Sequence, residues 1–320
     1  MINTKDAFVL GVDTSNYTTS LSLVQGGEVV SNVRRLLTVK HGEKGLRQSD
    51  AVFLHIKALP ELARKLFDNN LYCPEKLFAV GVSSRPRDAE GSYMPCFLAG
   101  VSFAEAVSGA LKIPLFEFSH QAGHISAAVH SCKNREIFEK DSFFAFHVSG
   151  GTTEALLCRY DGKTYLCEKV GGTKDASAGQ IVDRAGVCLG LDFPCGKELD
   201  KLSQKSSVRL PVCVSMDGAY FSMSGLQNKF EKYIKDGADI SDGANFIFRS
   251  IASALSKSLA QLRKMYGEKP CIFAGGVMCN SVIRAYLSEL ENVYFAETSL
   301  SSDNACGTAL LAYRRLLNAK

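Results

Sequence analysis

The sequence predicts an α/β protein built from two similar halves. The same strand–turn–strand plan occurs at residues 8–24 and again at residues 143–158, about half a chain apart. Between and after these two hairpins, apolar strand-like runs alternate with segments of helical periodicity, which is typical of parallel strands covered by helices. We therefore expect a duplicated architecture with a cleft between its halves.

Each predicted hairpin consists of an apolar strand, a turn rich in small polar residues and a second, alternating strand. The first turn contains Asp13, Thr14 and Ser15, and the second spans residues 149–153. Such turns can bind phosphate oxygens, because glycine lets the backbone approach and backbone amides point at the anion. Taken alone, either hairpin is better explained as a plain one, in which the hydroxyl residues only form the turn, and it is their recurrence that favours a duplicated architecture.

The other predicted elements follow in order along the chain. In the first half they are a helix over residues 51–68, a buried strand at 77–84, a small-residue helix at 100–111 and a strand at 113–118. In the second half they are a long helix at 245–267, a strand, glycine turn and helix at 271–280, and a last helix that begins near Ser302 and Asp303. A boundary near residues 130–142 assigns residues 1–135 to one lobe, with the helix 303–320 packed back on it, and residues 136–302 to the other.

The composition describes a globular protein without unusual charge. Of its 320 residues, 46% are hydrophobic and 22% charged, and the net charge of +4 allows contact with nucleic acid without requiring it. The 11 cysteines include no CxxC pair, which disfavours a disulfide framework or a zinc ribbon and favours reduced thiols. No apolar run is long enough for a signal peptide or a membrane span, so a cytoplasmic protein without membrane contact is expected.

Two histidines, His120 and His124, stand four residues apart at the start of a predicted helix. This spacing puts both imidazoles on one helical face, where they could hold a divalent metal or act as ordinary hydrogen-bonding residues. A catalytic metal generally needs a third protein ligand, for which Asp303 is a candidate, although Asp303 could instead cap the last helix. A metalloprotease is disfavoured, because Gln121 stands where such enzymes carry a glutamate general base.

The glycine turn at Gly275 and Gly276 follows a predicted strand and is followed by Asn280. Open α/β sheets bind ligands at the carboxyl ends of their strands, next to the amino end of the following helix. Asn280 could therefore hydrogen-bond a purine or a ribose.

Acidic residues also occur in the glycine-containing segment 171–200, among them Asp175, Asp183 and Asp200. Carboxylates in such a segment suit sugar hydroxyls or a cation. They suit turns and helix caps nearly as well.

Taken in order, these segments resemble the tRNA threonylcarbamoyladenosine transferase family (TsaD-type, also known as glycoproteases of peptidase family M22). The family pattern runs GIETS, HHxxGH, LVSGGHT, DDAAGEAFDK, YPGG, FSFSGLK, AGGVxAN and TDNA. The matching segments here are GVDTS (11–15), FSHQAGH (118–124), HVSGGTT (147–153), KDASAGQIVDR (174–184), FPCG (193–196), YFSMSGLQ (220–227), AGGVMCN (274–280) and SDNA (302–305). The resemblance covers nearly the whole chain in unbroken order, which modest motifs rarely do by chance.

The resemblance implies the duplicated, two-lobed fold of actin, hexokinase and Hsp70 (the ASKHA fold) with a central cleft. It implies one Fe2+ or Zn2+ per chain, held by His120, His124 and Asp303. It further implies metal-dependent transfer of a threonylcarbamoyl group from threonylcarbamoyl-adenylate to adenosine of tRNA. The expected partners are tRNA, an adenylate or ATP-type nucleotide, and other proteins of tRNA threonylcarbamoylation.

The same resemblance assigns substrate contacts but no catalytic side chain. By motif they are His147, Val148, Ser149, Gly150, Gly151, Asp183, Gly196 and Asn280, to which the glycine turn adds Gly275 and Gly276. The first hairpin turn, Asp13, Thr14 and Ser15, is a candidate for the phosphate side.

Several positions depart from the family pattern. The family's acidic pair after the first motif is replaced here by NYTT (16–19). Its glycine–proline loop is replaced by SRPRDAEGSYMPCFLAG (84–100). Three single residues also differ: a histidine, an aspartate and a glutamate of the family are Thr152, Ala176 and Gln180 here. These changes indicate a divergent paralogue with an altered substrate or reduced activity. Two alternatives stay open: a non-catalytic nucleotide-binding scaffold of a tRNA-modification complex, and an ATP-dependent kinase or ATPase of the same fold that uses Asp13.

Overall fold

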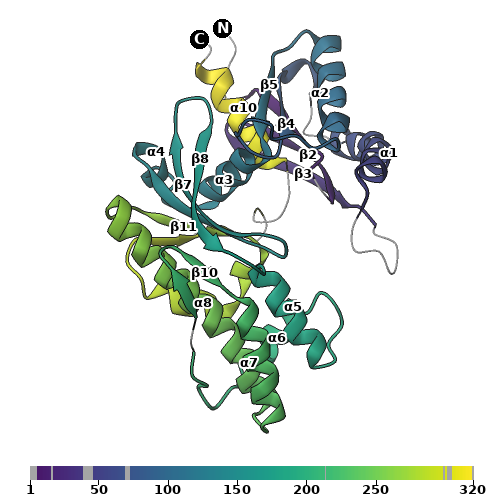
Figure 1. Ribbon diagram of the computed structural model, residues 1–320. Helices are drawn as coiled ribbons and strands as arrows, with labels where there is room; N and C mark the ends of the chain where they lie inside the picture. The colour runs from purple at the N-terminus through teal and green to yellow at the C-terminus, as the bar shows by residue number, and fades with distance from the viewer. Residues whose placement is uncertain are drawn as a thin grey trace. The chain divides into compact units, whose positions relative to one another are not determined.

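The computed structural model describes residues 6–15, 17–38, 46–68, 73–212, 214–297, 300 and 305–318. The contacts within the chain divide it into two compact units. Unit 1 comprises Met1–Arg135, Tyr160–Cys167 and Ser299–Lys320, and unit 2 comprises Glu136–Arg159 and Glu168–Thr298. Figure 1 shows the strands and helices of both units.

Unit 1 contains a five-stranded sheet with helices packed on it. Its strands are β1 (Phe8–Asp13), β2 (Thr18–Gln25), β3 (Glu28–Leu36), β4 (Leu77–Arg85) and β5 (Leu115–Ser119). Its helices are α1 (Gln48–Phe67), the 3-10 turn η2 (Pro74–Lys76), α2 (Phe97–Leu111), α3 (His120–Ser131) and α10 (Cys306–Asn318).

Most of the seven-stranded sheet lies in unit 2. Its strands are β6 (Phe143–Val148), β7 (Thr153–Tyr160), β8 (Tyr165–Thr173), β9 (Ser215–Asp217), β10 (Tyr220–Ser222), β11 (Cys271–Ala274) and β12 (Val293–Phe295). The helices are α4 (Ile137–Lys140), α5 (Ala178–Cys188), α6 (Gly196–Ser203), α7 (Ser224–Lys235), α8 (Ile240–Tyr266), the 3-10 turn η3 (Gly276–Cys279) and α9 (Ser281–Ser288).

The two sheets repeat one topology. The order in the first is β3-β2-β1-β4-β5, and the second contains the corresponding run β8-β7-β6-β11-β12. In both, the first hairpin is antiparallel, and the strands on its other side run parallel to its first strand. The predicted strand–turn–strand repeats are therefore confirmed as the starts of two like sheets.

Helix α10 packs on strands β1 and β4 and on helix α3. The contact with α3 is very close: a Cβ added to Gly307 would lie 1.8 Å from the carbonyl oxygen of Gly123, so only glycine fits there. The C-terminal helix is thus part of the support of α3, the helix that carries the histidine pair.

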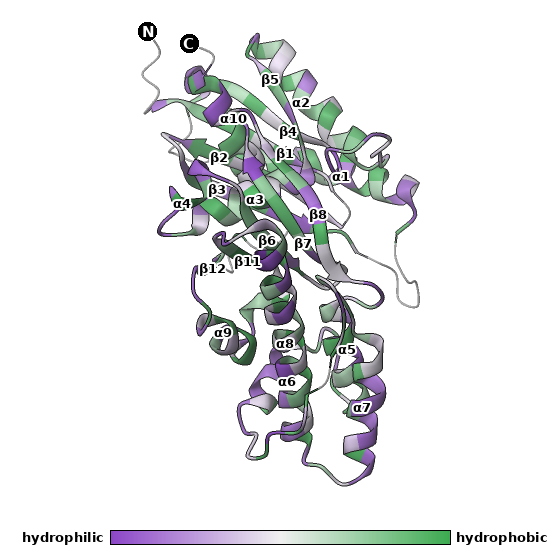
Figure 2. Cartoon of the chain, turned by 60° about the vertical axis from the view of Figure 1, so that its left-hand side comes forward, coloured by the Kyte–Doolittle hydropathy of each residue, from purple (hydrophilic) through white to green (hydrophobic). Residues whose placement is uncertain are grey.

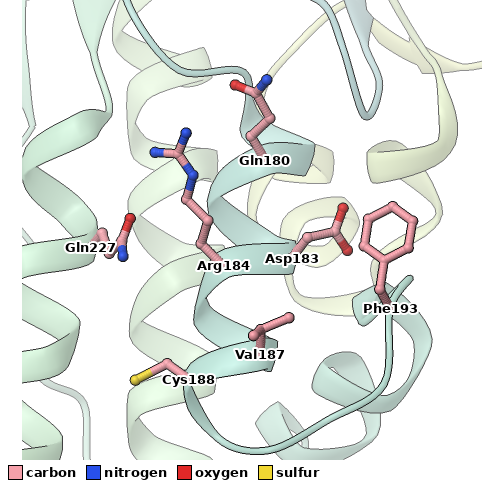
Figure 3. Close-up of a pocket in the computed structure, with 7 residues that line it drawn as sticks. All are labelled: Gln180, Asp183, Arg184, Val187, Cys188, Phe193 and Gln227. Atoms are coloured by element: carbon pink, nitrogen blue, oxygen red, sulfur yellow. The ribbon is translucent and has the colours of Figure 1, made fainter. Parts of the chain in front are cut away.

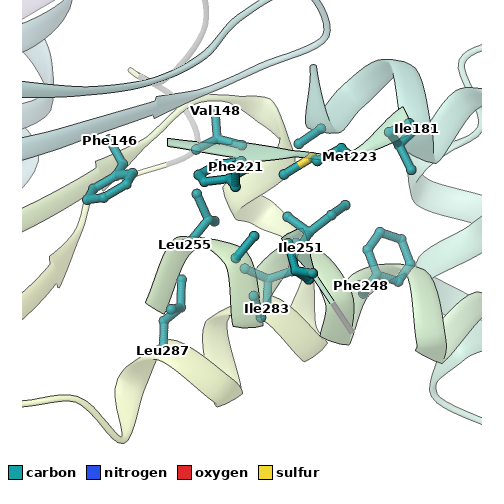
Figure 4. Close-up of a cluster of buried hydrophobic side chains, with 14 of the residues drawn as sticks. Phe146, Val148, Ile181, Phe221, Met223, Phe248, Ile251, Leu255, Ile283 and Leu287 are labelled. Atoms are coloured by element: carbon teal, nitrogen blue, oxygen red, sulfur yellow. The ribbon is translucent and has the colours of Figure 1, made fainter. Parts of the chain in front are cut away.

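The core of unit 2 joins its sheet to the long helix α8. Phe146 and Val148 of the sheet and Ile251 and Leu255 of α8 are all buried, and their side chains meet in one cluster (Figure 4). Each fully buried side chain of this size contributes about 1.5–3 kcal/mol relative to exposure. Helix α7 buries far less, Leu226 and Phe230 being its buried residues, and much of it is hydrophilic in Figure 2.

The structure confirms the expected elements with small changes at their ends. The long helix begins at Ile240 and not at 245, because Asp239 caps it by accepting a hydrogen bond from the Ser241 amide at 2.8 Å. The glycine turn of 274–276 leads first into a 3-10 turn and then into α9. No helix in the described part of the chain combines the length and apolarity needed to cross a bilayer.

Candidate functional site

The histidine pair lies on the first turns of α3, in unit 1. Ser119 ends β5 and caps the helix by accepting a hydrogen bond from the Ala122 amide at 3.2 Å. His120 and His124 are one turn apart, with their ring centroids 4.3 Å apart and their Nε2 atoms separated by 2.8 Å. The strand-to-helix switch at Ser119 thus turns both imidazoles to a common point.

Asp13 fixes the other side of the His120 ring. Its Oδ2 atom lies 2.8 Å from His120 Nδ1, and the residue is 1% exposed. Ser15 donates from its amide (2.8 Å) and its hydroxyl (2.5 Å) to Oδ1, and Ser83 Oγ donates to Oδ2 at 2.6 Å. Burial alone would raise the pKa of Asp13, but the charge and hydrogen bond of His120 and the two serines outweigh it, so the pKa is lowered.

The topology explains why these side chains meet. Strands β1, β4 and β5 run parallel, so their carboxyl ends share one edge of the sheet. Asp13 ends β1, Ser83 lies near the end of β4, and Ser119 ends β5 directly before the histidines. Ligand sites in open α/β sheets form at such an edge.

The pair fits a divalent metal by its donor chemistry. An ionised Asp13 accepts the Nδ1 proton of His120, which leaves a lone pair on Nε2, the atom that faces His124; this carboxylate–histidine arrangement is typical of metal ligands. Zinc–nitrogen bonds of about 2.0–2.1 Å in tetrahedral geometry separate two nitrogen ligands by about 3.3 Å, so the two Nε2 atoms would move apart by about half an ångström to hold zinc. Within the described residues no group of three or more His, Cys, Asp and Glu side chains could hold a metal. Asp303 lies outside the described residues, so its role as third ligand stays a prediction.

A loop that departs from the family pattern contacts the start of α3. Asp88 Oδ2 accepts a hydrogen bond from Ser119 Oγ at 2.7 Å, and Asp88 Oδ1 accepts from Arg85 Nε at 3.0 Å. The Gln121 amide donates to the carbonyl oxygen of Pro86 at 3.1 Å. Asp88 therefore connects this loop to the capping residue of the histidine helix.

The first hairpin turn is closed by its own contacts. Thr14 and Ser15 are 0% and 2% exposed. Thr14 Oγ1 donates to the Cys96 carbonyl at 3.0 Å and accepts from the Gly100 amide at 3.1 Å. Their predicted contact with phosphate stays a prediction. In this structure the Thr14 side chain holds the turn against the start of α2, and the Ser15 hydroxyl donates to Asp13.

Unit 2 contains a cavity of about 420 Å³ that gathers half of the predicted substrate residues. The predicted residues that line it are Gly150, Asp183, Gly196, Gly276 and Asn280. They come from the second hairpin turn, α5, the start of α6, η3 and the start of α9. Segments up to 130 residues apart in the sequence thus converge on one cavity, and their contact with a substrate stays a prediction.

The other five predicted residues are not among those that line this cavity. They are His147, Val148, Ser149, Gly151 and Gly275. Val148 is buried at the end of β6, and Gly275 has a φ of +106° and lies against it, so that an added Cβ would be 2.2 Å from the Val148 carbonyl oxygen. The close approach of β11 to β6 fixes where the glycine turn begins.

Asn280 is oriented by protein contacts. Its Oδ1 atom accepts from the Ile283 amide at 2.9 Å and so caps α9, and its Nδ2 donates to Asp200 Oδ1 at 2.7 Å. Ser281 Oγ also donates to Asp200 at 2.8 Å. Asp200, which lines the same cavity, therefore positions both residues.

Asp183 and Asp175 differ in role. Asp183 accepts from the Cys195 amide at 2.9 Å and lines the cavity. Asp175 accepts from the amides of Met223 (2.8 Å) and Ser224 (3.2 Å) and so caps the start of α7. Of the two readings that the sequence allowed for Asp175, the structure supports a helix cap.

The residues that sequence reasoning missed are Ser83, Asp88 and Ser119. Ser119 had a readable signal, because a serine directly before a predicted helix is a typical cap. Ser83 stands near the end of a predicted strand, where parallel strands bring ligand-facing residues together. Asp88 had no signal, since its loop follows no regular pattern.

Comparison with solved structures defines the class of protein. HypF of T. kodakarensis superposes with a TM-score of 0.61 at 13% identity over 98% of this chain and 48% of that one. Component A of the Acidaminococcus fermentans (R)-2-hydroxyglutaryl-CoA dehydratase gives 0.58 at 17% identity, over 98% and 100%. Together with the repeated sheet topology, these likenesses show the actin/hexokinase/Hsp70-like fold.

The sequence relatives define the family. The family model for TsaD, tRNA N6-adenosine threonylcarbamoyltransferase, matches residues 28–310. The Bacillus subtilis protein of that name is 31% identical over 90% of this chain and 83% of its own length. A Thermus thermophilus protein of the same name is 29% identical over 96% of this chain and 93% of its own length. The chain belongs to the tRNA N6-adenosine threonylcarbamoyltransferase family.

Proposed function

We propose that this protein transfers a threonylcarbamoyl group from threonylcarbamoyl-adenylate to the exocyclic amine of an adenosine in tRNA. Family membership supports the reaction class and the RNA acceptor. The observation that carries the proposal is the pair of Nε2 atoms 2.8 Å apart, backed by the buried Asp13. A fold of this class does not need such a pair to bind a nucleotide, whereas a metal-dependent acyl transfer would use it.

The metal would be one Fe2+ or Zn2+ per chain, held by His120 and His124, with Asp303 as the predicted third ligand. Such an ion, when bound, polarises a carbonyl group and stabilises the negative charge that develops on its oxygen. Asp13 keeps the proton of His120 on Nδ1 and the lone pair on Nε2.

The adenylate would occupy the cavity of unit 2. Asn280, held by Asp200, offers a fixed amide, and Gly196 and Gly276 let the nucleotide approach the backbone. In the transfer, the adenosine nitrogen bonds to the carbamoyl carbon and loses a proton. The bond from that carbon to the phosphate oxygen breaks, and AMP leaves with the electron pair.

A kinase or ATPase of the same fold is less well supported. Such an enzyme would need an accessible carboxylate near the phosphates, and Asp13 is the candidate in this chain. Asp13 is 1% exposed, and its two oxygens accept hydrogen bonds from Ser15, Ser83 and His120. The alternative of a non-catalytic scaffold predicts nucleotide binding without transfer. The transfer assay described next distinguishes it from the proposed enzyme.

The test combines metal analysis with transfer of labelled threonylcarbamoyl to tRNA, with and without the other threonylcarbamoylation proteins as partners. We expect about one metal ion per chain and transfer that fails in His124→Ala. His130→Ala is the matched control, because His130 lies on the same helix but pairs with Glu28. Wild-type protein that takes up no metal, or transfer that survives His124→Ala, would refute the proposal. A tRNA substrate would also put the protein in the cytoplasm, which fractionation can check.

A further inference from the structure

A second cavity of unit 2 lies on the outer face of α5. Its volume is about 470 Å³, within the range of about 300–1,000 Å³ usual for ligand pockets. Figure 3 shows one wall formed by the α5 side chains Gln180, Asp183, Arg184 and Val187, with Gln227 of α7 on one side and Phe193 of the following loop on the other. No role follows for this cavity from the site described above.

The apolar part of the cavity is exposed to solvent. Phe193 is 75% exposed and Val187 is 56% exposed, whereas the large side chains of the nearby core are almost wholly buried. A free aromatic ring of this kind offers a flat face on which another ring can stack. The apolar lining residues Val187, Cys188 and Phe193 are too few to bury the apolar face of a partner helix, which needs anchors along several turns.

Polar side chains along the cavity complement a nucleotide, and in Figure 3 Arg184 and Gln227 lie on the other side of α5 from Phe193. Gln180 accepts a hydrogen bond from the Ser177 amide with Oε1, and Gln227 donates to Glu231 with Nε2. The other atom of each carboxamide can contact a ligand: Nε2 of Gln180 as a donor and Oε1 of Gln227 as an acceptor. Arg184 adds a guanidinium one helical turn after Gln180 on α5. A ring face, a donor, an acceptor and a cation are what recognition of an unpaired base and its phosphate requires.

We infer that this cavity binds an unpaired nucleotide of the RNA, with its base stacked on Phe193 and its phosphate near Arg184. The inference rests on the proposed function for the choice of RNA as the ligand. The position of the cavity also supports the inference. Asp183 lines both this cavity and the one assigned to the adenylate, so the two cavities are neighbours. The RNA would thus be held beside the donor site by a contact that takes no part in the chemistry.

The experiment measures RNA affinity without any donor, using full-length protein, intact tRNA, its anticodon stem–loop and a fully paired RNA of the same stem. We expect Phe193→Ala to weaken binding of tRNA and of the stem–loop by about 5- to 150-fold, the loss of one stacked base. Phe193→Tyr should restore it. Arg184→Gln should reduce the slope of log affinity against log salt by about 1.

Tyr286→Ala is the matched control, because Tyr286 is an exposed aromatic residue of unit 2, on α9, that does not line the cavity. It should leave RNA affinity unchanged, and all variants should keep the wild-type melting temperature and adenylate affinity. Unchanged affinity in Phe193→Ala, or an equal loss for paired and unpaired RNA, would overturn the inference while leaving the proposed function intact. Failure of the wild-type protein to bind tRNA at all would overturn both.

Discussion

The Nδ1 atom of His120 lies 2.8 Å from Oδ2 of Asp13, a carboxylate that is 1% exposed. This contact links β1, which ends at Asp13, to His120, the first residue of α3. A buried carboxylate is stable only while its hydrogen-bond donors remain, and here one of the donor residues is a predicted metal ligand. Metal binding at the predicted site would therefore be coupled to the stability of unit 1 through one side chain.

Asp13→Asn should weaken both metal binding and folding. The amide cannot hold the His120 proton as a carboxylate does, and loss of such a second partner costs about 10- to 100-fold in metal affinity. Removing one member of a buried charged pair costs about 3 kcal/mol of unfolding free energy. Titration with Zn2+ and urea denaturation measure the two effects. Glu105→Gln, an exposed position on α2, should change neither, and wild-type metal affinity in Asp13→Asn would contradict the role given to Asp13.

Ser119→Ala should lower metal affinity through the backbone. The substitution removes the cap of α3 and the contact with Asp88, and a lost cap costs about 1 kcal/mol. Because His120 is the first residue of the helix, fraying there would misplace one predicted ligand of the pair. Ser177→Ala is the matched control, since it removes the cap of α5 in unit 2 at a similar cost. If both variants lose stability alike but only Ser119→Ala loses metal affinity, the positioning role is supported; equal metal affinity would exclude it.

The sequence predicted the repeated hairpins and the central strands because their patterns are long and strongly apolar. Strand β6, FFAFHV, is buried at every position except His147. It did not predict β9 and β10, which have three residues each and too few to show a period. Such short strands form because a neighbouring strand offers hydrogen bonds, and for β10 that neighbour is β8, which is distant in sequence.

The candidate site was predicted in parts and assembled only by the fold. The spacing of four residues already predicts that His120 and His124 share a helical face. Parallel strand pairing brings Asp13 and Ser83 to these histidines, and a loop contact brings Asp88. Asp13 and His120 are 107 positions apart in the sequence. No local pattern encodes such contacts. The same holds for Asp200 and Asn280, which are 80 positions apart.

Gly275→Ala should destabilise unit 2, whereas Gly276→Ala should not. At Gly275 the φ of +106° is one that side chains rarely adopt, and the new Cβ would lie 2.2 Å from the Val148 carbonyl oxygen, which is backbone and cannot swing away. At Gly276 no atom lies within 4 Å of an added Cβ. We expect a loss of at least about 2–3 kcal/mol for the first and under about 1 kcal/mol for the second, by urea denaturation. Equal losses would mean that β11 does not need its close approach to β6.

Asp175→Asn should change the acid stability of unit 2 in a predictable direction. Burial alone would raise the pKa of Asp175, but hydrogen bonds from Ser224, Met223 and Thr173 lower it by more, from 3.8 to about 2. A carboxylate with a depressed pKa stabilises the folded state above its unfolded pKa and loses that contribution as the pH falls towards the folded value.

The stability difference between wild-type protein and Asp175→Asn should therefore be full above pH about 5, shrink as the pH falls through about 4 to about 2, and vanish near pH about 1. Because Asp175 is exposed to solvent, screening limits the difference to about 1 kcal/mol. Urea denaturation of both proteins across this pH range measures the difference. The pH dependence that other carboxylates contribute cancels in it, because both proteins contain them. Ser224→Ala, which keeps the carboxylate but removes one donor, should show a smaller difference over the same range. A difference that is constant with pH would show that Asp175 caps α7 without the help of its charge.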